Sequence, residues 1–316
     1  MEARGAVLRR RVLSRFFPCE HCHEAVFQCF FCFFQQISLS RYCGVAFFRY
    51  LCAVLESVKS IERQYRTGEE PVLVMCSDKN AYICKYMRSS SAAYKMVCEF
   101  VGSQMAQAWA INTPDVALVK IKQEHWAGRF VQHNHNAPAF GSCQMYGVID
   151  VTPSTYCEVK RSAAMLRQLL KIALFDFWIA NEDRNANNAN LLYDIEKEQL
   201  VSIDYGCIFN TATYEFPMSQ LTSTDTILWS DLFKHLARGE SAVDAMVKDL
   251  EINYKECIKR SRKCATQILD TLPSEWNVPA RTVEEKMEQL FEKEWTDNVW
   301  TNFTECLNDN IEKIDL

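Results

Sequence analysis

The order of apolar and polar positions predicts a small sheet at the start of the ordinary part of the chain. Apolar residues at helical spacing predict a helix over 50–66, with Leu51, Val54, Leu55, Val58 and Ile61 on one face. Two runs of strand-forming residues, 72–76 and 81–86, flank the turn "SDKN" and predict a β-hairpin.

The next segments extend this sheet. A serine-rich start, with Ser91 or a neighbouring serine as N-cap, predicts a helix over about 89–111. Residues 112–122 then predict a turn and a strand, and 128–136 predict another strand that closes the sheet. The run "HNHN" at 133–136 has two histidines, too few for a metal site, and we interpret it as a polar strand end or loop.

From about residue 160 the pattern becomes helical. A strongly apolar helix is predicted up to Ala180, followed by an amide-rich loop and two short strands, "NLLYD" and "LVSIDYG". A long helix over 241–271 and one or two more over 283–314 follow. The sequence therefore predicts an α+β, two-lobed protein with an N-lobe over 46–140 and a helical C-lobe over 141–316. A nucleotide would fit in the cleft between the lobes.

Composition narrows the class of protein. The 316 residues are 48% hydrophobic and 24% charged, as in ordinary globular proteins. The net charge of −5, without a basic stripe, argues against direct nucleic-acid binding. No apolar run reaches the 18 residues of a membrane span, and the cysteines outside the first 52 residues lie in apolar contexts that favour reduced thiols. We therefore expect a cytoplasmic protein.

The first 45 residues differ from the rest. Residues 1–58 contain no Lys and no Asp but seven Arg, with a dense mixture of Phe and Cys. Cys19, Cys22, Cys29 and Cys32 form two C-x-x-C pairs, but only six residues separate the pairs, which is short for a zinc ribbon. A metal site and a targeting segment are two interpretations. We favour the third, a disordered or non-native extension over 1–45.

The loop "NEDRNANNAN", over 181–190, carries the strongest functional signal. Four residues separate Asp183 from Asn188, which is the interval of the catalytic loop D-x-x-x-x-N in protein kinases. Asp204 follows sixteen residues after Asn188, at the end of an apolar strand and two residues before Gly206. Each residue alone is more typical of a turn or helix cap. The conjunction of helix, loop, hairpin and Asp-x-Gly favours phosphoryl transfer.

These residue types suit that chemistry. Asp204 would bridge Mg²⁺ to the phosphates of ATP, and Asn188 would add a metal ligand without negative charge. Asp183 would orient the attacking hydroxyl group and accept its proton. Gly206 would let the backbone turn sharply beside the site.

The N-lobe supplies two further candidates. A kinase needs a strand lysine for the phosphates and a helix glutamate that holds this lysine. Lys85, on the second hairpin strand, and Glu99, on the following helix, are charged residues in apolar surroundings, so we expect them to pair. Two alternatives remain: Lys85 on an exposed sheet edge, and Lys95 in the role of Lys85.

The segments "LFDFWIANEDRNANNANLLYD" and "LVSIDYGCIFN" resemble the catalytic segments of the HipA-like kinases, in the compact branch of that family. "YICKYM", "CEFVGSQMAQAWAINTPD" and "LPSEWNV" are similar to the same branch, so the resemblance covers roughly residues 50–285. The loop is also similar to the D-R-H-x-x-N loop of phosphoinositide kinases.

The resemblance implies a two-lobed protein-kinase-like fold that uses ATP and Mg²⁺ to phosphorylate serine or threonine, on itself or on another protein. It implies Asp183 as the base, Asn188 and Asp204 as magnesium ligands, and Lys85 with Glu99 at the nucleotide. The sequence departs from the kinase pattern because the turn "SDKN" has no glycine. Either Ser77 and backbone amides would contact the phosphates instead, or nucleotide binding would be weak. Asn185 stands where such loops often carry His.

Several functions remain open at this point. The favoured one is an ATP-dependent kinase acting on a protein hydroxyl, with a possible cognate regulator. The same fold would also suit a kinase for a small molecule or lipid head group, or a non-catalytic pseudokinase or interaction module. A helical interaction protein whose amide-rich loop is only a turn is the remaining alternative.

Overall fold

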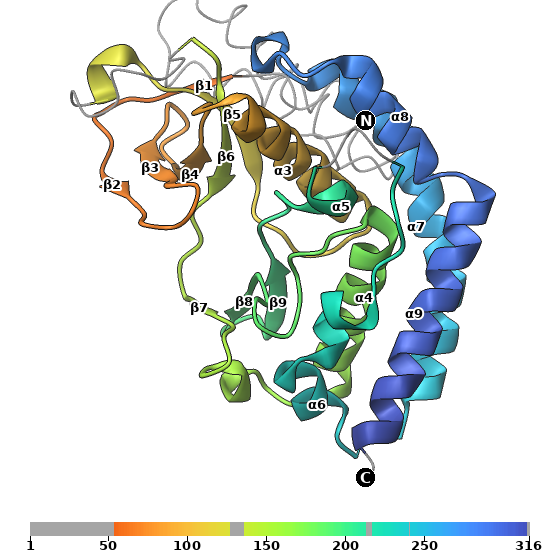
Figure 1. Cartoon of the computed structure of the whole chain (residues 1–316). Coiled ribbons are helices and arrows are strands. Elements are labelled where there is room, and N and C mark those ends of the chain that lie inside the picture. The colour runs from red at the N-terminus through yellow and green to blue at the C-terminus, as the bar shows by residue number, and fades with distance from the viewer. Residues whose placement is uncertain (1–53, 127–135, 213–216, 240, 315–316) are drawn as a thin grey trace, which may run out of the picture. The chain divides into compact units, whose positions relative to one another are not determined.

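A mixed sheet of six strands opens the described part of the chain (Figure 1). The computed structural model describes residues 54–126, 136–212, 217–239 and 241–314. The expected extension over 1–45 lies outside these residues, as do nearly all of the expected strand over 128–136 and of "HNHN". The strands, in the spatial order β1-β5-β6-β4-β3-β2, are β1 (Leu55–Glu56), β5 (Val116–Lys120), β6 (Ala139–Cys143), β4 (Ala81–Lys85), β3 (Val72–Met75) and β2 (Arg63–Gln64).

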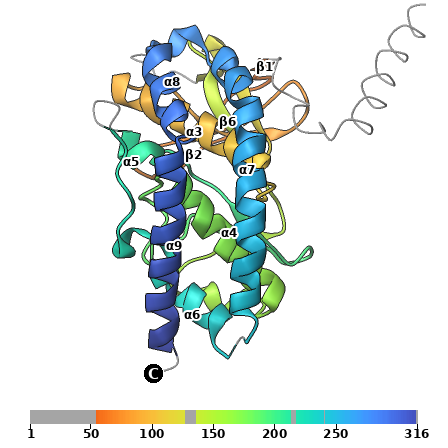
Figure 2. The ribbon, with the colours of Figure 1, turned by 90° about the vertical axis from the view of Figure 1, so that its right-hand side faces the viewer.

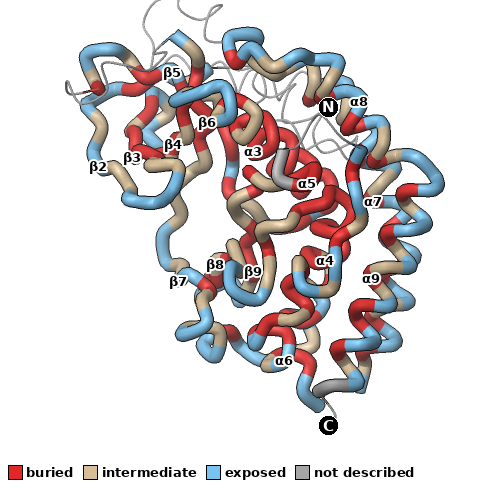
Figure 3. Tube along the Cα trace, in the orientation of Figure 1, coloured by how far each residue is buried: buried red, intermediate tan, exposed pale blue. Residues whose placement is uncertain are grey.

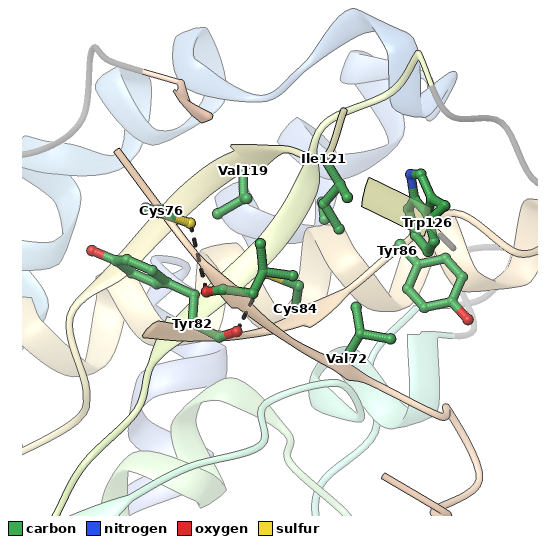
Figure 4. Close-up of a cluster of buried hydrophobic side chains, with 11 residues drawn as sticks. Val72, Cys76, Tyr82, Cys84, Tyr86, Val119, Ile121 and Trp126 are labelled. Carbon is green, nitrogen blue, oxygen red and sulfur yellow. Dashed lines mark hydrogen bonds between the residues drawn. The ribbon is translucent and has the colours of Figure 1, made fainter. Parts of the chain in front are cut away.

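Alternate side chains of this sheet form a hydrophobic core (Figure 4). Residues two apart on a strand face the same side, so Val72 and Val74 on β3 join Tyr82 and Cys84 on β4. All of them are at most 4% exposed. The core ends at Tyr86, whose ring meets the edge of Trp126 with centroids 4.9 Å apart. The expected hairpin is therefore present, and its register is Met75 opposite Ala81.

Helix α3 (Ser90–Ala108) follows the hairpin and is mostly buried. Ser89 is its N-cap, and the Ser89 side chain accepts a hydrogen bond from the backbone N–H of Ala92. This confirms the predicted helix and its serine cap. The helix packs against β6 and against α5 and α7 of the helical part, so it joins the two parts of the fold.

Helix α4 (Ala163–Ile179) is the centre of the helical part (Figure 3). Twelve of its 17 residues are buried, because the helix is apolar on nearly every side. It ends at Ala180, which takes the left-handed conformation, and the expected amide-rich loop begins there. A three-stranded sheet lies beside it, in the order β7 (Val148–Asp150), β8 (Leu191–Asp194) and β9 (Gln199–Ser202).

Helices make up most of the remaining chain (Figure 2). The long helix and the C-terminal helices predicted from the sequence are confirmed as α7, α8 and α9. Tyr254 of α7 stacks on Trp300 of α9, and the indole of Trp178 in α4 donates to the backbone oxygen of Leu290, at 2.9 Å. The helices are α5 (Ile208–Ala212), α6 (Asp231–Ala237), α7 (Val243–Thr271), α8 (Ala280–Gln289) and α9 (Lys293–Ile314).

A tryptophan between α7 and α8 reaches back to the six-stranded sheet. Trp276 is 1% exposed, and its indole N–H donates to the backbone oxygen of Pro138, just before β6, at 2.7 Å. Its ring also meets the edge of Phe100 in α3, with centroids 6.4 Å apart. This residue lies within the "LPSEWNV" segment, and it attaches the helical part to the sheet.

The predicted helix over 50–66 is wrong in its described part. Residues 55–56 and 63–64 are short strands, and Val54 and Val58 of the predicted apolar face are about half exposed, at 49% and 52%. β1 pairs with β5, and β2 pairs with β3, so strand pairing outweighs the local periodicity.

Besides β1 and β2, the strands β6 and β7 were not predicted. The β6 sequence "AFGSC" is rich in small residues, yet it lies between β4 and β5. Gly141 allows this close approach, because an added Cβ would lie 2.8 Å from the Val119 side chain. The six-stranded sheet therefore continues to Cys143, past the expected lobe boundary at residue 140.

Helix α3 touches the segment after β9 at Gly102. A Cβ added there would lie 2.4 Å from the Tyr205 Cβ. We expect Gly102→Ala to lower the free energy of unfolding by about 1–3 kcal/mol in urea denaturation, because overpacking outweighs the better helix propensity of Ala. Gly68→Ala, where no atom lies within 4 Å of the added Cβ, is the matched control. A Gly102→Ala protein as stable as the wild type would show that this contact yields without strain.

Candidate active site

Lys85 lies at the end of strand β4 and gathers acidic side chains from three other segments. Its Nζ contacts the carboxylate of Glu99 in α3 and lies 3.0 Å from Oδ1 of Asp204, beyond β9. Oε2 of Glu69, in the loop between β2 and β3, lies 2.7 Å from the same Nζ. The backbone N–H of Tyr205 donates to Glu99 Oε2 at 2.9 Å. The structure thus brings Lys85, Glu99 and Asp204 together.

The pKa values of the three predicted members of this cluster are shifted in different directions by their surroundings. Burial raises the pKa of Glu99 to about 8, although the Lys85 charge opposes this. Burial also acts on Asp204, but Lys85 and the hydrogen bonds to Asp204 outweigh it and hold the pKa of that carboxyl at about 2. Burial would lower the pKa of Lys85, but Glu99, Asp204 and Glu69 raise it well above its usual value. At neutral pH Asp204 is therefore ionised and Lys85 is protonated.

The sharp backbone turn beside this cluster is at Asp204, not at Gly206. Asp204 has a φ of +58°, in the left-handed region, whereas the φ of Gly206 lies outside that region. Gly206 is close to the cluster for another reason. A Cβ added there would lie 3.2 Å from Glu99 Oε1 and 3.5 Å from Asp204 Oδ1, so glycine leaves room for both carboxylates.

The amide-rich loop follows α4 and folds back on itself. The backbone N–H groups of Asn185 and Asn188 each donate to the other residue's carbonyl oxygen, at 3.0 and 3.3 Å. Asp183 Oδ2 accepts a hydrogen bond from the Asn190 side chain at 3.1 Å, which orients the carboxylate. Asp183 is partly exposed and Asn188 is exposed, so both can meet a ligand.

A buried ion pair holds this loop in place. Arg184 and Asp176 of α4 are both 0% exposed, and Arg184 Nε donates to Asp176 Oδ2 at 2.8 Å. The same guanidinium donates to the carbonyl oxygens of Ala189, at 3.0 Å, and of Asn190. It also donates to the carbonyl oxygen of Ile203, at 3.2 Å. One side chain therefore binds α4, the loop and the residue before Asp204.

Further contacts place Asp183 near Asp204. The backbone N–H of Ile203 donates to the carbonyl oxygen of Asn190 at 3.0 Å, so the two segments run together. The Cys207 thiol senses both carboxylates: burial, then the negative charges of Asp183 and Asp204, raise its pKa to about 11. The loop and the Asp-x-Gly segment thus present two carboxylates to one region.

The structure does not bring Ser77 to this cluster. Ser77 lies in the turn before β4, whereas Lys85 ends that strand, and its Oγ accepts a hydrogen bond from the backbone N–H of Glu56 at 3.3 Å. The segment that does reach Lys85 is the loop between β2 and β3, which contains Gly68 and Glu69. Of these two segments, the one that contains a glycine and contacts Lys85 is therefore the loop between β2 and β3.

Comparison with protein families decides the class of this site. A family model described as HipA-like kinase matches residues 58–305, more than half of the chain. The chain belongs to the HipA-like kinase family. No curated protein matched the sequence.

A solved kinase structure shares this fold. This HipA-like kinase superposes on a proinflammatory kinase of Helicobacter pylori, CtkA, with a TM-score of 0.50 and 14% identity, over 80% of this chain and 99% of that one. Golgi casein kinase gives a TM-score of 0.44 at 12% identity, over 80% and 74% of the two chains. A form of it with Mn and ADP bound gives 0.42 at 10%, over 81% and 73%. The predicted α+β, two-lobed protein-kinase-like fold is confirmed.

The donor groups of this HipA-like kinase suit Mg²⁺. No group of three or more His, Cys, Asp or Glu side chains in the described ranges is arranged to hold a metal ion by itself. Mg²⁺ commonly takes only one or two protein ligands and completes its shell with phosphates and water. The ionised carboxylate of Asp204, 40% exposed, and the exposed amide of Asn188 fit such a set.

Among the described helices, none combines the length and apolar character that crossing a membrane requires.

Sequence reasoning gave no role to three residues of this HipA-like kinase site, Asp176, Arg184 and Glu69. Asp176 stands alone in the apolar run "LFDFW", and a buried charge needs a partner, so pairing with Arg184 was a readable signal. Glu69 carries no such signal. It lies in the polar run "RTGEEP", and only the folded arrangement brings it to Lys85.

Proposed function

We propose that the protein transfers the terminal phosphoryl group of ATP, bound with Mg²⁺, to a hydroxyl group of a protein, either its own chain or a partner. The observation that carries this proposal is the position of Lys85, held by Glu99 and 3.0 Å from Asp204. Membership of a kinase family supports the reaction class.

Each residue has a role that its surroundings support. The Lys85 ammonium would bind phosphate oxygens, with Glu99 fixing its position. Asp204 and Asn188 would hold Mg²⁺, which supplies positive charge against the charge of the transferred phosphoryl group. Asp183 would orient the acceptor hydroxyl and take its proton as the new O–P bond forms and ADP departs. Arg184 would keep Asp183 and Asp204 in register.

The acceptor is assigned to a protein on the strength of the family resemblance. The competing acceptors are a small molecule and a lipid head group. Incubation with ATP, Mg²⁺ and either dephosphorylated model proteins or small polyols would separate them, with transfer followed by radiolabelled phosphate. Label in protein alone supports the proposal, and label in a polyol alone would reassign the acceptor.

Asp204→Asn tests the proposed site. We expect it to weaken Mg²⁺–ATP binding at least about tenfold and to abolish transfer, because an amide cannot supply the metal's charged ligand. Calorimetric titration with Mg²⁺–ATP measures binding, and intact-mass spectrometry measures phosphate gained. Asp249→Asn, an exposed position on α7, is the charge-matched control. Wild-type binding by Asp204→Asn would remove Asp204 from the site.

A further inference from the structure

A cavity of about 430 Å³ lies between the β2–β3 loop and the first turns of α3. The loop contributes Gly68 and Glu69, strand β4 contributes Lys85, and α3 contributes Lys95. The N-cap Ser89 also lines the cavity, so the start of α3 adds the positive end of a helix dipole. The cavity is therefore rich in groups that attract anions, and it adjoins the Lys85 cluster.

The Glu69 carboxylate bridges the two lysines of this cavity, Lys85 and Lys95. One carboxylate oxygen of Glu69 lies 2.7 Å from Lys85 Nζ, and the other lies 3.0 Å from Lys95 Nζ. Lys95 and Glu99 are four residues apart on α3, so they share one side of the helix. Lys95 thus faces the same cluster as Glu99. A phosphate presents oxygens at a spacing comparable to that of a carboxylate, so a phosphoryl group would fit where Glu69 lies.

Both lysines carry a raised pKa in this arrangement. Burial acts to lower the pKa of Lys95, but Glu69 more than reverses this and raises it. Lys85 keeps Glu99 and Asp204 as partners when Glu69 leaves, whereas the ion pair of Lys95 in this cavity is the one with Glu69. Departure of Glu69 would therefore leave a partly exposed ammonium that a phosphate would satisfy.

The position of Glu69 makes its departure easy. It belongs to a loop that joins two short strands, and a Cβ added at the preceding Gly68 would meet no atom within 4 Å. The Glu69 side chain is 27% exposed, so rotation toward solvent needs little rearrangement of the core.

We propose that Lys85 and Lys95 form an anion subsite for a phosphate of the nucleotide, and that Glu69 occupies this subsite until the nucleotide displaces it. Lys95 is then a second phosphate-binding lysine, and Glu69 competes with the nucleotide. This inference rests on the proposed function, because it deepens the description of the same nucleotide site.

The experiment compares variants by calorimetric titration with Mg²⁺–ATP and, separately, with inorganic tripolyphosphate. We expect Glu69→Gln to lower the Kd for Mg²⁺–ATP by about 3–10-fold, which is the size of a partly exposed ion pair. Glu56→Gln is the control for the change of charge, because Glu56 also forms an ion pair, with Lys122, but lies outside the cavity lining. Its Kd should stay within about twofold of the wild type.

Lys95→Gln gives the complementary result. We expect it to raise the Kd for Mg²⁺–ATP by about 3–10-fold while leaving the Kd for adenosine within about twofold, because only the phosphates would contact Lys95. Lys122→Gln removes the same charge outside the cavity lining and should change neither constant.

The outcomes separate this inference from the proposed function. If ATP binds the wild type and Glu69→Gln behaves like Glu56→Gln, the anion subsite is overturned and the kinase proposal stands. If neither the wild type nor any variant binds ATP but tripolyphosphate binds Glu69→Gln more tightly than Glu56→Gln, the anion site and its competition with Glu69 stand, whereas its assignment to a nucleotide and the kinase proposal fall. Absence of binding by both probes in all variants would overturn both.

Discussion

Asp183→Asn is expected to slow phosphoryl transfer by about two to four orders of magnitude while leaving Mg²⁺–ATP affinity within a few-fold. The loss is the usual contribution of a positioned general base. Asparagine keeps the size of the side chain and can still accept the hydrogen bond that Asn190 donates at 3.1 Å, so the loop should keep its shape. Only the ability to accept the hydroxyl proton is removed.

Single-turnover transfer measured beside calorimetric Mg²⁺–ATP titration separates the two effects. Asp249→Asn, exposed on α7, makes the same change of charge far along the chain from the loop and should transfer phosphate at the wild-type rate. Equal transfer by Asp183→Asn and the wild type would exclude Asp183 as the base. A parallel loss of binding and transfer would instead assign it a role in holding the nucleotide.

Arg184→Met is expected to lower the free energy of unfolding by about 3–5 kcal/mol, the usual loss when one partner of a buried ion pair is removed. Asp176 would keep its charge at 0% exposure without the guanidinium, and the carbonyl oxygens of Ala189, Asn190 and Ile203 would lose a donor. Methionine fills much of the volume, so the loss reports the charge and the hydrogen bonds. Urea denaturation monitored by tryptophan fluorescence measures it.

Two further variants serve as references for the loss of stability in Arg184→Met. Arg281→Met breaks an exposed pair with Glu285, in which the arginine side chain is 87% exposed, and should change stability by less than about 1 kcal/mol. Arg184→Lys keeps the charge but not the planar fork of donors, so an intermediate loss is expected. If Arg184→Met were as stable as Arg281→Met, the ion pair would not be what anchors the loop.

Much of the fold could be predicted because long apolar patterns dominate it. The helix ending at Ala180 is apolar on nearly every side, and two runs of strand-forming residues flank the turn "SDKN", so each pattern predicts a single structure. The helix predicted over 50–66 was wrong because the strands found there are only two residues long and are fixed by pairing with other strands, β1 with β5 and β2 with β3. Strand β6 was not predicted because its small residues have weak strand propensity, and its position in the sheet is determined by pairing with β4 and β5.

The site was predictable where the chemistry constrains spacing in the sequence. The interval from Asp183 to Asn188 and the Asp-x-Gly segment are local patterns, and the pairing of Lys85 with Glu99 followed from the difficulty of leaving charges unpaired in apolar surroundings. Glu69 and Lys95 were not predictable as a pair, because loop closure brings them together and neither stands out from its polar neighbours. Ser77 was predicted to contact the phosphates because the hairpin turn "SDKN" was taken as the phosphate-binding turn and contains no glycine.

The attachment made by Trp276 limits how the two lobes can move. Its indole is fixed to Pro138 before β6 and to Phe100 in α3, so the sheet and the helices are fastened at that point. Any movement of the helices relative to the sheet would therefore have to carry or break these two contacts. The loop that carries Glu69 is held to the sheet in another way, by its place between β2 and β3 and by the ion pair of Glu69 with Lys85 at the end of β4. Trp276, Pro138 and Phe100 thus join the two lobes at a point apart from the residues that line the Lys85 cavity.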